Sequence, residues 1–222
     1  MFSIVKRSKD LLTRLTQSQP VCLNCFCDLT DGLGLLDLFR KEDVLCGYCR
    51  QQFKPIRKSF QVLGESVYAY YAYDAFFEKL IYQVNENKDE TLAPVFLHPY
   101  VGDLKKRCLN KTLVLVPSSR KKTESRGFDA LRCMIQAINR EMICPFEKDD
   151  IKQSQRNVTQ RAKIKNHIRL LHPAWIEGKD IVLIDDVCTT GHSLKACVDL
   201  LKPLANSIIV IVLAMHPDHT NI

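Results

Sequence analysis

The stretch from Ile181 to Leu194, "IVLIDDVCTTGHSL", constrains the fold of this chain more than any other part of its sequence. It opens with four consecutive apolar residues, the pattern of a strand that is buried on both faces. Two acids follow, then a hydroxyl-rich turn with a glycine, and then the spacing of a helix. Strands buried on both faces belong to parallel sheets that are covered by helices, so this stretch predicts an α/β protein.

The segments on either side of this stretch extend the pattern. Residues 112–117, "TLVLVP", and 207–215, "SIIVIVLAM", read as buried strands, whereas residues 128–142 and 193–204 have helical spacing. Alternating strands and helices with short turns predict a parallel sheet with right-handed crossovers. Ligands bind such sheets beyond the carboxyl ends of the strands, which is where residues 116–127 and 185–193 are expected.

Paired carboxylates at such an edge can accept hydrogen bonds from vicinal sugar hydroxyls or hold a hydrated magnesium ion. Backbone N–H groups and hydroxyls at a helix start form a cradle for phosphate, and a glycine there permits close approach or a positive φ. Together these groups suit a ribose 5-phosphate. The predicted catalytic carboxylates are Asp185 and Asp186, and the predicted phosphate turn is Thr189, Thr190, Gly191, His192 and Ser193. Helix capping or surface ion pairing by the two acids is the alternative.

Two cysteine pairs, Cys22-x2-Cys25 and Cys46-x2-Cys49, stand 20 residues apart. Two such pairs can complete a tetrahedron of thiolates around a structural zinc ion, whose binding would fold a segment with little core of its own. Redox-active thiols are the alternative, and Cys27 can replace Cys25 as a ligand. The predicted domains are residues 1–58, a lead-in with the zinc module, and residues 59–222, the α/β domain.

The chain carries a net charge of +7, an excess of cations that suits phosphates or nucleic acid. Its sequence has no apolar run near the roughly 18 residues of a membrane-spanning helix and no signal-peptide core. These features predict a cytoplasmic protein without membrane insertion. The basic stretch at residues 152–169 is a candidate mobile flap or nucleic-acid contact, but it lacks interleaved aromatic residues for base stacking.

The stretch "VLIDDVCTTGHS" resembles the phosphoribosyl-pyrophosphate (PRPP) signature of the type I phosphoribosyltransferases. Together with the cysteine pairs, it makes residues 21 to about 216 similar to the ComF family of competence proteins, in which a zinc finger precedes a phosphoribosyltransferase domain. A second marker of that family matches Val116-Pro117, Arg126-Gly127-Phe128 and Ala130, and a third is matched loosely within residues 155–166.

The resemblance implies a type I phosphoribosyltransferase-like parallel sheet with helices on both faces, PRPP binding with Mg²⁺, and a part in DNA uptake during natural transformation. Arg120, Lys121 and Arg126 would contact the pyrophosphate. Thr189 stands where purine-salvage relatives have an aspartate thought to act as general base, which puts nucleobase transfer in doubt. The alternatives are an active phosphoribosyltransferase of nucleotide metabolism and a non-catalytic adaptor that binds single-stranded DNA or a DNA-uptake helicase.

Overall fold

The computed structural model describes residues 21–29, 44–148 and 168–219 of the chain. The chain divides into two compact units, Met1–Gln51 and Gln52–Ile222. The first unit contains the paired cysteines and a short helix, α2 (Gly47–Gln51). The second unit contains a large sheet and its helices. No helix in the described part of the chain is long and apolar enough to cross a membrane.

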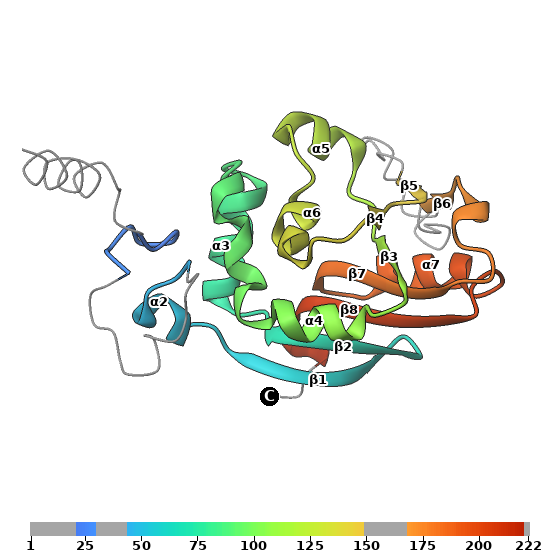
Figure 1. Ribbon diagram of the computed structural model, residues 1–222, viewed down its shortest axis with the longest axis horizontal. Helices are drawn as coiled ribbons and strands as arrows, with labels where there is room; N and C mark the ends of the chain where they lie inside the picture. The colour runs from blue at the N-terminus through green and yellow to red at the C-terminus, as the bar shows by residue number, and fades with distance from the viewer. Residues whose placement is uncertain (1–20, 30–43, 149–167, 220–222) are drawn as a thin grey trace, which may run out of the picture. The chain divides into compact units, whose positions relative to one another are not determined.

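The second unit is built on a six-stranded sheet with the order β1-β2-β8-β7-β3-β4 (Figure 1). Its strands are β1 (Pro55–Val62), β2 (Glu65–Ala72), β3 (Thr112–Leu115), β4 (Met142–Ile143), β7 (Asp180–Cys188) and β8 (Ser207–Met215). The β1–β2 pair is antiparallel, and the other four pairings are parallel. This mostly parallel sheet confirms the predicted fold class, and β3, β7 and β8 are the three expected strands. The antiparallel hairpin at one edge was not predicted from the strand–helix alternation.

Helices connect and cover the strands of this sheet. The α-helices are α3 (Ala75–Asn85), α4 (Val101–Arg107), α5 (Arg120–Arg126), α6 (Ala130–Ile135) and α7 (His192–Leu201). The 3₁₀ segments are η2 (Glu90–Phe96), η3 (His98–Tyr100), η4 (Gln136–Ile138), η7 (Pro173–Trp175) and η8 (Pro217–His219). The helical spacing expected over residues 128–142 is interrupted, because Asn139 adopts a left-handed φ of 50° after η4. The helix α7 forms the crossover between β7 and β8, as expected.

Neighbouring residues of β2 show that both faces of the sheet are covered. Ala69 is fully buried in the same core cluster as Leu194 and Val198 of α7. The next residue, Tyr70, donates a hydrogen bond from its hydroxyl to Asp103 Oδ2 of α4 at 2.9 Å. Because successive side chains of a strand point to opposite faces, α7 and α4 lie on opposite sides of the sheet.

A second, two-stranded sheet packs beside α7. It pairs β5 (Phe146–Lys148) with β6 (Ile168–Leu170) in antiparallel register (Figure 1). Phe146 and Ile168 are buried in the core cluster that also contains Leu194 and Cys197 of α7. This packing places the β5–β6 pair against the first turns of α7. Most of the predicted basic stretch, residues 152–167, lies outside the described residues.

Candidate functional site

The two acids lie within the last part of β7, which continues through Cys188 because Val187 and Cys188 still pair with Ala214 and Met215 of β8. Each carboxylate accepts a hydrogen bond from the next backbone N–H. Asp186 N donates to Asp185 Oδ1 at 3.0 Å, and Val187 N donates to Asp186 Oδ1 at 2.7 Å. The acids therefore have fixed positions at the carboxyl edge of the sheet, the usual ligand-binding edge of this architecture.

The environment of Asp185 favours its protonated form. Burial raises the pKa of Asp185 well above its ordinary range, and the negative charge of Asp186 raises it further. Asp185 as a residue keeps some accessible surface, but its carboxyl group is surrounded by protein atoms. This burial of the carboxyl group is the main cause of its raised pKa. A ligand that brings a cation or several hydroxyl donors would favour the ionised form of this pair.

The turn from Thr189 to Ser193 opens α7. Gly191 occupies the N-cap position with a left-handed φ of 77°, and its carbonyl accepts the hydrogen bond of Lys195 N at 2.8 Å. Thr189, Thr190 and His192 are exposed, and His192 Nδ1 lies 2.9 Å from Thr190 Oγ1. The first N–H groups of a ten-residue helix and the hydroxyl-bearing residues Thr189, Thr190 and Ser193 thus lie close in sequence to the acid pair. This arrangement can hold a phosphate.

The predicted pyrophosphate contacts, Arg120, Lys121 and Arg126, all belong to α5. Arg120 forms an exposed ion pair with Glu124, with 2.8 Å between Nε and Oε1. Arg126 donates from Nε to the carbonyl of Asn85, the last residue of α3, at 3.1 Å. Within the described residues, no hydrogen bond or ion pair joins Arg120 or Arg126 to the acid pair. The structure therefore gives Arg126 an anchoring contact in addition to its predicted role.

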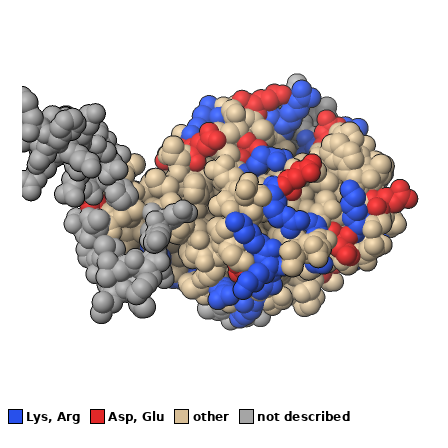
Figure 2. Space-filling view, viewed as in Figure 1, with Lys and Arg blue, Asp and Glu red and all other residues tan. Residues whose placement is uncertain are grey.

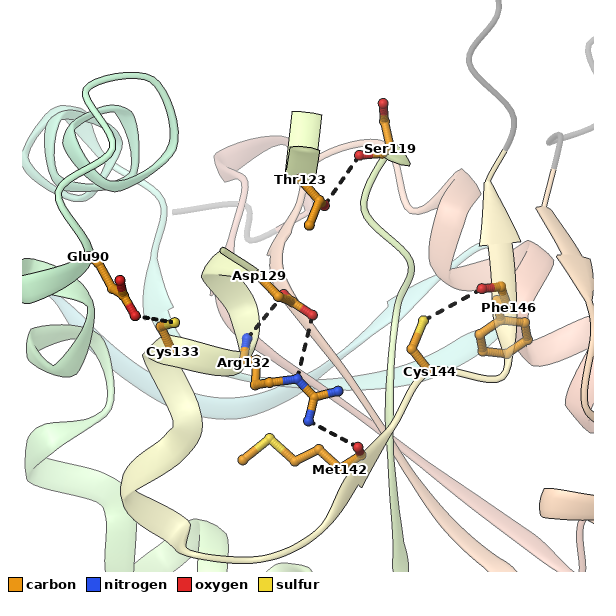
Figure 3. Close-up of polar contacts among 9 residues, drawn as sticks. All are labelled: Glu90, Ser119, Thr123, Asp129, Arg132, Cys133, Met142, Cys144 and Phe146. Carbon is orange, nitrogen blue, oxygen red and sulfur yellow. Dashed lines mark hydrogen bonds and ion pairs between the residues drawn. The ribbon is translucent and has the colours of Figure 1, made fainter. Parts of the chain in front are cut away.

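Hydrogen bonds order the start of α5 and tie the residues beyond its end to β4 (Figure 3). At the start, Thr123 Oγ1 donates to the carbonyl of Ser119 at 3.3 Å. Beyond the end, Asp129 caps α6 by accepting from Arg132 N at 3.3 Å, and Arg132 also donates to the carbonyl of Met142 in β4 at 3.1 Å. These contacts connect the loop after β3 to the neighbouring parallel strand.

Two aromatic groups at the same edge were not predicted as site residues. Tyr73 follows β2 and His216 follows β8, and their ring centroids lie 6.0 Å apart. Burial raises the pKa of Tyr73, with contributions from the charges of Glu78 and Asp186. His216 Nδ1 lies 3.3 Å from Asp218 Oδ2. The sequence could have indicated Tyr73 and His216 only through their positions, because each directly follows a strand that runs parallel to β7.

In the first unit, four thiols form a cluster able to hold a metal ion such as zinc. The Sγ atoms of Cys22, Cys25, Cys46 and Cys49 all lie within 4.8 Å of one another. Asn24 Nδ2 donates to Cys49 Sγ at 3.1 Å, and Cys49 N donates to Cys46 Sγ at 3.4 Å. Both N–H groups therefore point at sulfur atoms of the cluster, and the thiolate is the form of cysteine that binds metal.

A fifth thiol lies next to this cluster. Cys27 Sγ is 3.3 Å from Cys25 Sγ, and both residues are exposed. A hydrogen bond from the Cys27 backbone is the main cause that lowers the pKa of Cys25 to about 6. The geometry thus brings together the four predicted ligands and leaves Cys27 within reach of the same site.

Comparison with known protein families finds a match for part of the second unit. Residues 130–221, less than half of the chain, match the family described as the phosphoribosyl transferase domain. This span contains the acid pair and the phosphate turn, so this part of the chain is a phosphoribosyltransferase-type domain. No curated protein sequence matches the chain.

Distant likenesses also exist among solved structures. A hypoxanthine phosphoribosyltransferase from Staphylococcus aureus aligns in its tetragonal crystal form with a TM-score of 0.36 and 17% identity. The orthorhombic form gives a TM-score of 0.38 and 19% identity. Both alignments cover 60% of this chain and 66% of the enzyme, so the chain spans less than two thirds of its length. The substrate of that enzyme is not carried over to this chain.

Proposed function

We propose that the second unit binds PRPP at the carboxyl edge of β7. Asp185 and Asp186 would accept hydrogen bonds from the ribose hydroxyls, and the turn from Thr189 to Ser193 would hold the 5-phosphate. The observation that carries this proposal is the acid pair followed directly by a hydroxyl-rich helix start, within residues that match a phosphoribosyl transferase domain.

Asp185 and Asp186 could also hold a hydrated magnesium ion, which would supply positive charge to offset that of the pyrophosphate. The cations of α5, Arg120, Lys121 and Arg126, would bind the pyrophosphate group. If transfer takes place, a nucleophile attacks C1 of the ribose, the bond from C1 to the pyrophosphate oxygen breaks, and magnesium pyrophosphate leaves. Because Thr189 replaces the expected general base, the proposed role is PRPP binding, either as a sensor or with an acceptor that needs no base in this turn.

The experiment is calorimetric titration with PRPP and Mg²⁺, comparing the unmodified chain with the Asp185→Asn/Asp186→Asn variant. A heat of binding that the variant lacks would support the proposal, whereas no heat with the unmodified chain would overturn it. Pyrophosphate release in the presence of a panel of acceptors would identify an enzyme. Tight binding without release across the panel would identify a sensor.

The competence role is a further part of this proposal and rests on the sequence resemblance. The first unit would bind one zinc ion through Cys22, Cys25, Cys46 and Cys49, and the protein would act in the cytoplasm with single-stranded DNA or a DNA-uptake helicase. A basic surface supports a polyanionic partner. Figure 2 shows Lys and Arg side chains gathered over the region of α4 and β1.

The same surface contains aromatic rings under cations. The Arg107 guanidinium lies 3.7 Å from the Tyr68 ring centroid, and that of Arg57 lies 5.1 Å from Tyr100. Stacked guanidinium and aromatic groups are common in sites for single-stranded nucleic acid. Replacing Lys58, Lys105 and Lys106 by alanine should weaken binding of an oligothymidylate and reduce its salt dependence. Unchanged binding would remove this surface from the proposal.

A further inference from the structure

The β5–β6 hairpin extends a cation to the phosphate turn. Lys148, the last residue of β5, donates from Nζ to Ser193 Oγ at 3.2 Å across 45 positions of sequence. Phe146 of the same strand is 6% exposed in the core shared with α7, so the backbone that bears Lys148 is firmly placed. The contact therefore joins two separately built elements at the turn, and no sequence motif includes it.

The charge of Lys148 also reaches the acid pair. Burial and the charge of Asp186 raise the pKa of Asp185, and the positive charge of Lys148 opposes this rise. Lys148 thus contacts the hydroxyl of Ser193 and also acts on Asp185 through its charge. Its ammonium group has no carboxylate within ion-pair distance among the residues that the structure describes.

The nearest cation on α7 itself is already neutralised. Lys195 forms ion pairs with Glu65, at 3.2 Å, and with Asp199. A cation beside the turn would strengthen phosphate binding, because a charge-assisted hydrogen bond adds to the neutral N–H and hydroxyl donors already there. Within the described part of the site, two basic side chains contact the turn: Lys148 at the Ser193 hydroxyl and His219 at the Thr189 carbonyl, and of these Lys148 is the ammonium.

We propose that Lys148 is a phosphate-binding residue of the PRPP site, an inference that rests on the proposed function. Its ammonium would move from the Ser193 hydroxyl to an oxygen of the 5-phosphate, and Ser193 would then donate to the same phosphate. The strand β5 is accordingly part of the ligand site, so ligand binding would stabilise the packing of the β5–β6 pair on α7.

The test measures binding of the two parts of PRPP separately. Ribose 5-phosphate and magnesium pyrophosphate are titrated separately into the unmodified chain and into Lys148→Met, Lys148→Arg and Lys202→Met. Lys202 lies at the far end of α7 and pairs with Glu65, which makes it the matched control. Loss of a charge-assisted hydrogen bond predicts about a tenfold or greater loss of ribose 5-phosphate affinity in Lys148→Met. Lys148→Arg should recover much of it, and pyrophosphate affinity should stay unchanged.

The remaining outcomes show whether the proposed function or only the role of Lys148 is wrong. If the unmodified chain binds neither probe, the proposed function is wrong and the inference falls with it. If the unmodified chain binds ribose 5-phosphate and Lys148→Met binds it equally well, only the role of Lys148 is wrong. Equal losses for both probes, without recovery in Lys148→Arg, would make Lys148 a structural support of the whole site and would also overturn the proposal.

Discussion

Gly191 lies so close to Val62 that a β-carbon built on it would come within 2.4 Å of Val62 Cγ1. Val62 ends β1 and is 3% exposed, so it has little room to move away. Gly191 also has a φ of 77°, in the left-handed region where a β-carbon is strained. The phosphate turn is therefore placed by direct contact with the β1–β2 hairpin.

This contact predicts that Gly191→Ala lowers the free energy of unfolding by about 2–4 kcal/mol, because overpacking adds to backbone strain. The matched control is Gly178→Ala, where φ is 67° but nothing lies within 4 Å of the added carbon. That control should lose only about 1–2 kcal/mol. Urea denaturation measures both values. Equal losses of unfolding free energy at the two positions would show that Val62 moves away from the added carbon without loss of stability.

Replacing Asp185 by asparagine should stabilise the fold at neutral pH. The folded-state pKa of Asp185 is raised, so the folded chain binds this proton more tightly than the unfolded chain does. Stability is therefore lost as pH rises from the unfolded pKa, about 3.9, to the folded pKa, and asparagine removes that loss.

Denaturation of both proteins at several pH values checks this prediction. The advantage of Asp185→Asn should be small in acid, grow with rising pH and level off above the folded pKa. Asp186→Asn should reduce the effect, because the charge of Asp186 contributes to the raised pKa of Asp185. An advantage that is constant with pH would contradict the assigned cause.

The thiol cluster predicts about one zinc ion per chain. Cys25→Ser should lose most of this metal after dialysis, because it removes one of the four clustered thiols. Cys27→Ser, which changes the adjacent exposed thiol, should retain it. Elemental analysis by mass spectrometry measures the content. The reverse result would make Cys27 the ligand, and metal retained in both variants would mean that the two thiols substitute for each other.

The anchoring contact of Arg126 predicts a loss of stability that is independent of ligand. Arg126→Ala removes a partly buried hydrogen bond to the carbonyl of Asn85 and should cost about 1 kcal/mol. Arg120→Ala, which removes an exposed pair with Glu124 on the same helix, should change stability by less than about 0.5 kcal/mol. Thermal melts without ligand compare the two. Equal effects would leave Arg126 with a ligand-binding role alone.

The strands of the sheet could be predicted where the chain is apolar on both faces. Residues 181–184 and 207–215 have this composition, and both form strands as expected. The β5–β6 hairpin could not be predicted, because its strands have three residues each and depend on packing against α7.

Prediction of the site had a similar limit. The acid pair and the turn are local in sequence, so a pattern reveals them. Lys148 and His216 approach the same edge through long-range topology, and each stands alone in the sequence without a recognisable motif. The β1–β2 pairing is local, through a two-residue turn at Leu63 and Gly64, but the approach of Val62 to Gly191 joins distant positions and likewise depends on tertiary structure.

The strand β8 lies in the middle of the sheet although it is the last strand in sequence. Val67 of β2 pairs with Val210, so the hairpin made early in synthesis waits for a partner made more than a hundred residues later. Until β8 emerges from the ribosome, β2 and β7 present open edges to solvent or to chaperones. Nascent chains that are stopped before Ser207 should therefore aggregate or be degraded, whereas release of the complete strand should close the sheet in one cooperative step.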